Sequence, residues 1–169
     1  AGGVPRGERL VQECGIGLVP IRRDGERLAF AAPALLRSGP VDRDLVEQKT
    51  SALGLRPEHV LAAEWVDNGP GWLALRLDSA QRVLDVRPDM AAIGDPGVGI
   101  VGLYEGGHPD DPAVTVEVRA FIPNEGVPED PVTGSLNAGI AIWLRGTGLL
   151  PSSYVASQGT ALGRAGRVF

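Results

Sequence analysis

The stretch from Leu136 to Leu144 constrains the fold more than any other part of this sequence. Asn137 is its one polar residue, and charged residues resume only at Arg145. A helix that is apolar on every side is buried on every side. The rest of the chain consists of short apolar runs between 24 glycines and 14 prolines, a pattern typical of strands joined by turns. We therefore predict an α+β fold in which a curved, mostly antiparallel sheet wraps around a buried central helix at about 134–145.

Pairs of apolar runs around turn residues predict the strands of this sheet. Asp24-Gly25 supplies the positive φ that a tight hairpin needs, and the run from Asp67 to Gly71 predicts a second turn. The predicted strands are 18–21, 28–30, 61–66, 72–77, 98–104 and 114–121, with further strands at Val155 and at 167–169. An amphipathic helix is expected over 42–53, and Ser79 is the expected cap of a shorter one.

The cluster Ser38-Gly39-Pro40 is the candidate boundary between two parts of the chain. Residues 1–38 are interpreted as the remnant of a first lobe, built of strands, and residues 39–169 as a second lobe that holds the central helix. The sequence begins at Ala1 without an initiator Met and stops within a predicted strand. We interpret it as a truncated chain.

Charge and composition exclude several classes of function. The formal net charge is −5, and the 16 basic residues form no stripe that would neutralise a phosphate backbone, so nucleic-acid binding is not expected. The single cysteine, Cys14, excludes an intrachain disulfide, and His59 and His108 lack the spacing of a zinc or haem motif. The longest apolar run is shorter than the roughly 20 residues that span a bilayer. We expect a cytoplasmic protein that binds neither metal nor membrane.

The residues between the last predicted strand and the central helix carry the candidate chemistry. A Pro- and Gly-rich loop follows Phe121 and leads to Thr133, Gly134 and Ser135 at the start of the helix. Free N–H groups and the positive end of the helix dipole favour an anion there, and a substrate carboxylate is the expected guest. Asp130 adds a proton acceptor or an anchor for an amine. The predicted substrate-binding residues are therefore these four, and Asp130 and Ser135 are also the catalytic candidates.

Structural roles compete with these assignments. Thr133 to Ser135 is also a plain helix cap, and Asp130 also complements the helix dipole. Glu125 and Glu129 are interpreted as solvated loop carboxylates and Cys14 as a core or edge thiol. The tryptophans are expected in the core, since no basic residues alternate with them.

The run Glu129-Asp130-Pro131-Val132-Thr133-Gly134-Ser135 resembles the signature of the phenazine-biosynthesis PhzF-like family. It is preceded by Arg119-Ala120-Phe121, and Gln158-Gly159 and Leu162-Gly163-Arg164 follow it. The likeness extends back through Asn68 to Trp72 and covers nearly the whole chain, as the C-terminal part of such a protein. It implies a diaminopimelate-epimerase-like fold with two lobes, each a sheet curled around a helix, and an active site between them. It also implies a cofactor-free isomerase of small carboxylates, with its second-lobe site on Asp130, Gly134 and Ser135.

Three readings of the function remain. The first is the isomerase, although the family's acid/base glutamate and its Gly-His-Pro stretch have no counterpart here; Gly107-His108-Pro109 is assigned to a solvent-exposed loop. The second, a two-cysteine racemase, needs a thiol at the position that Ser135 occupies, so it is disfavoured. The third is a non-catalytic fragment or binding lobe that lacks the glutamate. A lobe without its partner would expose apolar surface, which favours a homodimer.

Overall fold

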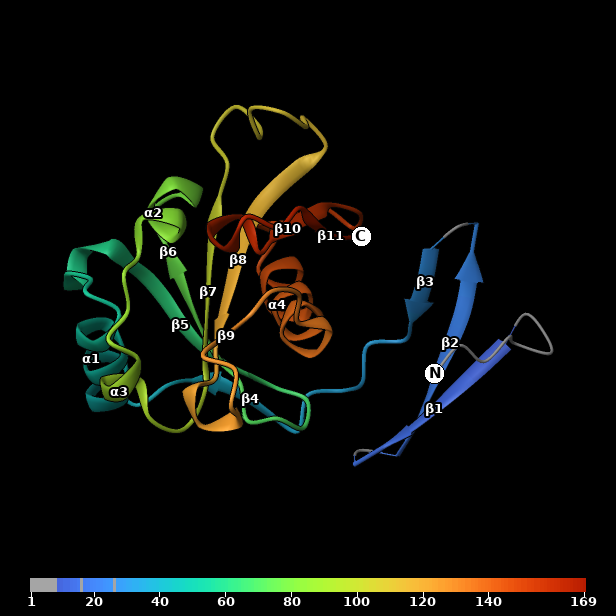
Figure 1. The fold of residues 1–169 in the computed structure, drawn as a ribbon, viewed down its shortest axis with the longest axis horizontal. Coiled ribbons are helices and arrows are strands. Elements are labelled where there is room, and N and C mark those ends of the chain that lie inside the picture. Colours follow the sequence, from blue (N-terminus) through green and yellow to red (C-terminus); the bar gives the residue numbers. More distant parts are fainter. Residues whose placement is uncertain (1–8, 16, 26) are drawn as a thin grey trace. The chain divides into compact units, whose positions relative to one another are not determined.

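The computed structural model describes residues 9–15, 17–25 and 27–169, and the chain divides into two compact units (Figure 1). Unit 1 is Ala1–Ala34 and unit 2 is Leu35–Phe169. Ser38-Gly39-Pro40, the boundary expected from the sequence, lies inside an edge strand of unit 2, because its backbone pairs with Glu64, Trp65 and Val66 of the next strand.

The described part of unit 1 forms a three-stranded antiparallel sheet. Its strands are β1 (Arg9–Cys14), β2 (Gly17–Asp24) and β3 (Arg27–Phe30), in the order β1-β2-β3. Asp24 pairs with Arg27 across the predicted hairpin, which confirms it. No described side chain of this unit is buried, and Leu18 and Leu28 are 71% and 64% exposed.

Unit 2 contains a second sheet with the strand order β11-β10-β8-β7-β6-β5-β4, and β9 pairs with β8. Most neighbours are antiparallel, but β6 with β7 and β8 with β10 are parallel. The α+β class and the mostly antiparallel sheet are confirmed. The strands are β4 (Arg37–Pro40), β5 (Val60–Asp67), β6 (Leu73–Leu77), β7 (Val98–Leu103), β8 (Val114–Phe121), β9 (Glu129–Asp130), β10 (Val155–Gln158) and β11 (Gly166–Val168).

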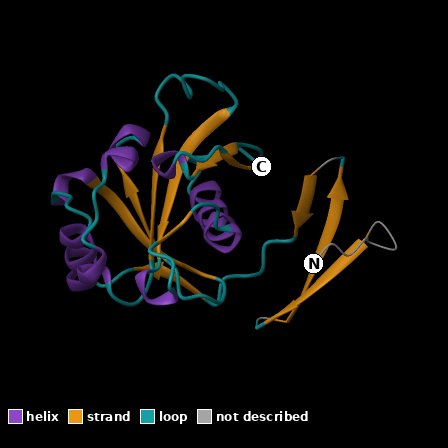
Figure 2. Cartoon of the chain, in the orientation of Figure 1, coloured by secondary structure: helices purple, strands orange, loops and turns teal. Residues whose placement is uncertain are grey.

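Helices cover both faces of this sheet (Figures 1 and 2). One face carries α4, and the other carries α1, α2 and α3. Ser79 caps α2 as predicted, by accepting the N–H of Arg82, whereas α3 was not predicted and is capped by Asp89. The helices are α1 (Arg43–Ala52), α2 (Ala80–Asp85), α3 (Met90–Ile93) and α4 (Gly134–Gly146), with 3-10 turns η1 (Pro57–His59), η2 (Pro123–Glu125) and η3 (Thr160–Leu162).

Alternation along the strands supplies one core to each face. In β6, Leu73 and Leu75 face α1 to α3, whereas Ala74 faces α4. The same alternation runs through β7, so both faces of the sheet carry an apolar core. β8 gives Val116, Val118 and Ala120 to the α4 face, but its other face holds the buried Arg119 besides Phe121. The α4 core consists of Val66, Trp72, Ala74, Val101, Val116, Val118, Ala120, Leu136, Ile140, Leu144, Leu150 and Ala156.

The central helix is less enclosed than its sequence predicts. Leu136, Ile140 and Leu144 are buried against the sheet, but Ile142 is 40% exposed. The sheet covers one side of α4, so the prediction of burial on every side is wrong. The contact on the covered side is close, because a Cβ at Gly139 would lie 2.4 Å from the backbone oxygen of Val66 in β5.

Candidate functional site

The candidate site forms where β8, β9 and α4 meet. β9 folds back on the end of β8 and pairs Ala120 with Asp130 and Phe121 with Glu129. Paired residues share a face of the sheet, and neighbours along a strand face opposite sides. Asp130 therefore lies on the face that carries α4, whereas Glu129 lies on the face that carries α2.

The start of α4 has no side-chain cap. Thr133 occupies the cap position, but its side chain makes no bond to the first-turn N–H groups. Its Oγ1 donates instead to Oδ2 of Asp130 at 2.8 Å. The first N–H groups of a helix have no partner within the helix, so the start of α4 keeps its capacity to bind an anion.

Gln158, the last residue of β10, makes four hydrogen bonds that hold Asp130, Thr133 and Asn137 in place. Its Oε1 accepts the backbone N–H of Thr133 (2.9 Å) and Nδ2 of Asn137 (2.7 Å). Its Nε2 donates to the backbone oxygen of Asp130 (2.9 Å) and to Oγ1 of Thr133 (3.0 Å). The backbone N–H only donates and the backbone oxygen only accepts, which fixes the orientation of the amide. The Thr133 hydroxyl therefore accepts a hydrogen bond from Gln158 and donates one to Asp130.

Ser135 is held by the turn between β5 and β6. Nδ2 of Asn68 donates to its backbone oxygen at 2.9 Å, and Nε1 of Trp72 donates to its hydroxyl at 3.0 Å. Oδ1 of Asp67 shapes the turn by accepting the N–H groups of Gly69 and Gly71. The structure thus brings the four predicted site residues to one place, but Thr133 is buried there and its side-chain and backbone protons are both bound.

Sequence reasoning missed the supporting residues Trp72 and Asn68, and it named Gln158 in the motif without its bonds to the site. Their bonds to the site join residues 25 to 67 positions apart in the chain, and no local pattern reports such pairing. The Gln158-Gly159 pair stood in the quoted motif, but its position at the end of β10 follows only from the parallel register.

A model of the phenazine biosynthesis-like protein family matches residues 1–169. The chain belongs to this family. A protein named antisense-enhancing sequence 1, from Schizosaccharomyces pombe, is 27% identical over 95% of this chain and 57% of its own length. An uncharacterized isomerase from Pseudomonas aeruginosa is 35% identical over 93% of this chain and 55% of its own length. The chain thus spans little more than half the length of these curated relatives.

Solved structures of PhzF family proteins share the fold. The Bacillus anthracis protein superposes with a TM-score of 0.74 at 16% identity, over 97% of this chain and 60% of that one. The Enterococcus faecalis protein gives 0.67 at 21% identity, over 92% and 55% of the two chains. These likenesses confirm the PhzF-family fold that the sequence predicted.

Glu129 was expected to be a solvated loop carboxylate, and this expectation is wrong. It accepts two hydrogen bonds of 2.8 Å from Arg119, and the two side chains are 8% and 5% exposed. Arg119 also donates to the backbone oxygens of Val83 and Val86 at the end of α2. Glu129 lies over this arginine because β9 pairs with β8. Because the sequence predicts a loop at Glu129, it does not predict this contact.

Three further expectations have mixed outcomes. Trp65 and Trp72 are buried as predicted, and Trp143 is half-buried. His108 lies in a loop as expected but is not free in solvent, because its ring packs edge-on against Tyr104 at 4.9 Å between centroids. The side chains of Cys14 and Glu125 lie outside the described part of the structure.

Two surface depressions lie away from Asp130 and Ser135. One, of about 530 Å³, lies on the α2 face, where Arg119 and Glu129 line it together with the 3-10 turn η3. The other, of about 160 Å³, is lined by the residues that follow α1 and by residues of η1 and α2, among them His59 and Arg82. Neither depression includes the start of α4.

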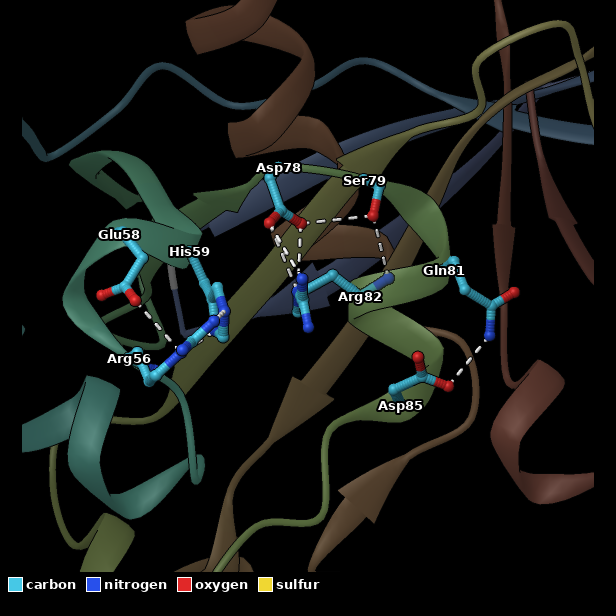
Figure 3. Close-up of polar contacts among 8 residues, drawn as sticks. All are labelled: Arg56, Glu58, His59, Asp78, Ser79, Gln81, Arg82 and Asp85. Carbon is cyan, nitrogen blue, oxygen red and sulfur yellow. Dashed lines mark hydrogen bonds and ion pairs between the residues drawn. The ribbon is translucent and has the colours of Figure 1, made fainter.

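The second depression adjoins a charged cluster that is a rival candidate (Figure 3). Arg82 forms an ion pair of 3.2 Å with Asp78, and its hydrogen bond holds the pKa of that carboxyl below its usual range. Arg56 contacts Glu58 and His59, and Gln81 donates to Asp85. These groups bind one another, and Ser79 caps α2. The cluster therefore has a structural role, and its side chains are already paired.

Within residues 9–15, 17–25 and 27–169, no three His, Cys, Asp or Glu side chains are grouped closely enough to hold a metal ion. No helix in the same ranges is long and apolar enough to cross a membrane.

Proposed function

We propose that this chain supplies the carboxylate-binding lobe of a PhzF-like isomerase. The enzyme would move a proton from one carbon to another on a small carboxylate-bearing substrate in an interlobe cleft, without a cofactor. The observation that carries the proposal is the uncapped start of α4 beside Asp130, whose Oδ2 accepts a hydrogen bond from the Thr133 hydroxyl. Relatives named as isomerases support the class of reaction.

The roles of the residues follow from their bonds. The N–H groups of Gly134 and Ser135 and the Ser135 hydroxyl would bind the substrate carboxylate, since all are donors at the positive end of a helix. Asp130 would offer Oδ1 to a donor group of the substrate or to the migrating proton. Thr133 would support Asp130 and not contact the substrate, because it is buried. The principal acid/base group, a glutamate in the family, would come from outside these 169 residues.

Two measurements test this function in order. Backbone amide resonances of Gly134 and Ser135 should shift when acetate is added to the 169-residue chain, and Ser135→Ala should weaken this response about fivefold. Ser153→Ala, which alters an exposed serine, is the matched control. In the full-length protein, deuterium from D₂O should enter a carbon-bound position of cyclic amino or hydroxy acids, and Asp130→Ala should slow it by about 10²-fold or more.

The alternative is a non-catalytic binding lobe. Unit 2 favours it in one respect, because its sheet has a core on both faces without any further lobe. Acetate binding without carbon-bound exchange in any longer form would support this alternative. The homodimer and the cytoplasmic location stay predictions; sedimentation equilibrium tests the first.

A further inference from the structure

The hydrogen bond between Trp72 and Ser135 has a fixed direction. It joins the indole Nε1 to the serine Oγ at 3.0 Å. An indole N–H only donates, whereas a hydroxyl either donates or accepts. The Ser135 oxygen must therefore accept this bond, and its own proton is not used in it.

That proton is available to a ligand. Thr133, the other hydroxyl at the start of α4, gives its proton to Asp130. The hydrogen bonds of the described residues include none that Ser135 Oγ donates to a named acceptor. Ser135 is half-buried and follows the uncapped first residue of the helix. Its hydroxyl therefore presents a donor beside the free backbone donors.

Trp72 is rigidly placed for this role. It is 2% exposed, and its ring packs so tightly that a Cβ at Gly97 would lie 3.1 Å from it. Its backbone oxygen accepts the N–H of Val66, and Asn68 in the same turn bonds the backbone oxygen of Ser135. Neither partner can turn away without breaking the turn, so the direction of the bond is part of the fold.

We propose that Trp72 is a positioning residue that sets the ligand selectivity of the site. By occupying one of the two acceptor positions of the Ser135 oxygen, Trp72 turns the hydroxyl toward donating its proton to a ligand, so that the site favours a carboxylate oxygen over an amide or ammonium N–H at this point. The inference rests on the proposed carboxylate site and adds the residue that enforces its preference.

The test compares acetate with acetamide, which has nearly the same shape but carries a donor and no charge. Both are titrated into the full chain and followed by the amide resonances of Gly134 and Ser135. Trp72→Phe keeps an aromatic ring without the N–H, and we expect the acetate-to-acetamide affinity ratio to fall about fivefold, the effect of one hydrogen bond. In a Ser135→Ala background, Trp72→Phe should leave the ratio unchanged, because the two residues act through one bond. A purely structural role of Trp72 would weaken both probes equally.

A second measurement needs no change at Trp72. Its indole N–H resonance should move on adding acetate to the unaltered chain and should not move in Ser135→Ala. An unchanged ratio in Trp72→Phe, or an indole resonance that ignores acetate while the Gly134 and Ser135 amides respond, would overturn this inference alone. If those amides themselves ignore acetate, the proposed carboxylate site fails and the inference with it.

Discussion

The two sheets of this protein differ in how far their side chains are buried. The sheet of unit 2 has helices and an apolar core on both faces, whereas the described part of unit 1 has three strands and no buried side chain. Leu10, Ile21 and Phe30 are paired across unit 1 and share one face, and no helix in the described part of that unit covers it. Three strands without a covering layer gain little stability from burial. Unit 2 therefore supplies most of the free energy of folding, and it also carries the candidate site.

Loss of the buried ion pair should give the largest contrast between the units. Arg119→Leu leaves Glu129 buried without its partner, and we expect the free energy of unfolding to fall by about 3–5 kcal/mol. Arg22→Leu, on an exposed position of β2, should change it by no more than about 0.5 kcal/mol. Urea denaturation followed by tryptophan fluorescence measures both, since all three tryptophans lie in unit 2. Similar effects of the two changes would break the comparison.

Matched leucine truncations sharpen it further. Leu75 is fully buried and Leu28 is 64% exposed. We expect Leu75→Ala to cost about 2–5 kcal/mol through lost burial and the cavity it leaves. Leu28→Ala should cost less than about 0.5 kcal/mol in the same denaturation assay. A cost above 1 kcal/mol for Leu28→Ala would mean that unit 1 is covered by something in solution.

Alkaline pH should destabilise unit 2 selectively, because both tyrosines lie there. Burial raises the pKa of Tyr154 to about 12. Between its usual value near 10 and about 12, the unfolded chain loses the phenol proton while the folded chain keeps it. This stability is complete below pH 10 and is lost as the pH rises, by about 2–3 kcal/mol at most. Tyr154→Phe should flatten this slope in denaturation curves measured across the range, and Tyr104, whose pKa burial also raises, should retain a part of it.

Glycine substitutions give the smallest contrast. Gly139→Ala would press a methyl group onto the backbone of β5, and we expect a net loss of about 1–3 kcal/mol despite the better helix propensity of alanine. Gly146→Ala, in the same helix, and Gly15→Ala, in unit 1, meet no atom within 4 Å. Thermal melting should show no loss for either control. A neutral Gly139→Ala would show that α4 and β5 are less tightly packed than described.

The sequence was informative wherever one period governs a segment. Turn residues around alternating apolar runs predicted the β2–β3 and β5–β6 hairpins, and the apolar run after Ser135 predicted α4. The two parallel pairings were not predicted, since a parallel neighbour depends on a crossover that no local pattern encodes.

The same limit applied to the candidate site. Asp130, Gly134 and Ser135 were predicted because they lie close together in the sequence, at a helix start. Glu129 was misassigned, because a two-residue strand such as β9 has no recognisable period and its partner Arg119 lies ten positions away. The contacts of Trp72 and Gln158 with the site depend on which strands become neighbours in the fold, so no local sequence pattern predicts them.

The parallel pairing of β8 with β10 also has a kinetic meaning. Thr133 and Gln158 are 25 residues apart, and their bond closes only after α4 has crossed over the sheet and β10 has docked. Closing such a long loop costs entropy before any contact rewards it, so pairings of this kind form late in folding. Asp130 and Thr133 should therefore acquire their geometry among the last events of folding, and a destabilised β10 would silence the site while most of the sheet remained native.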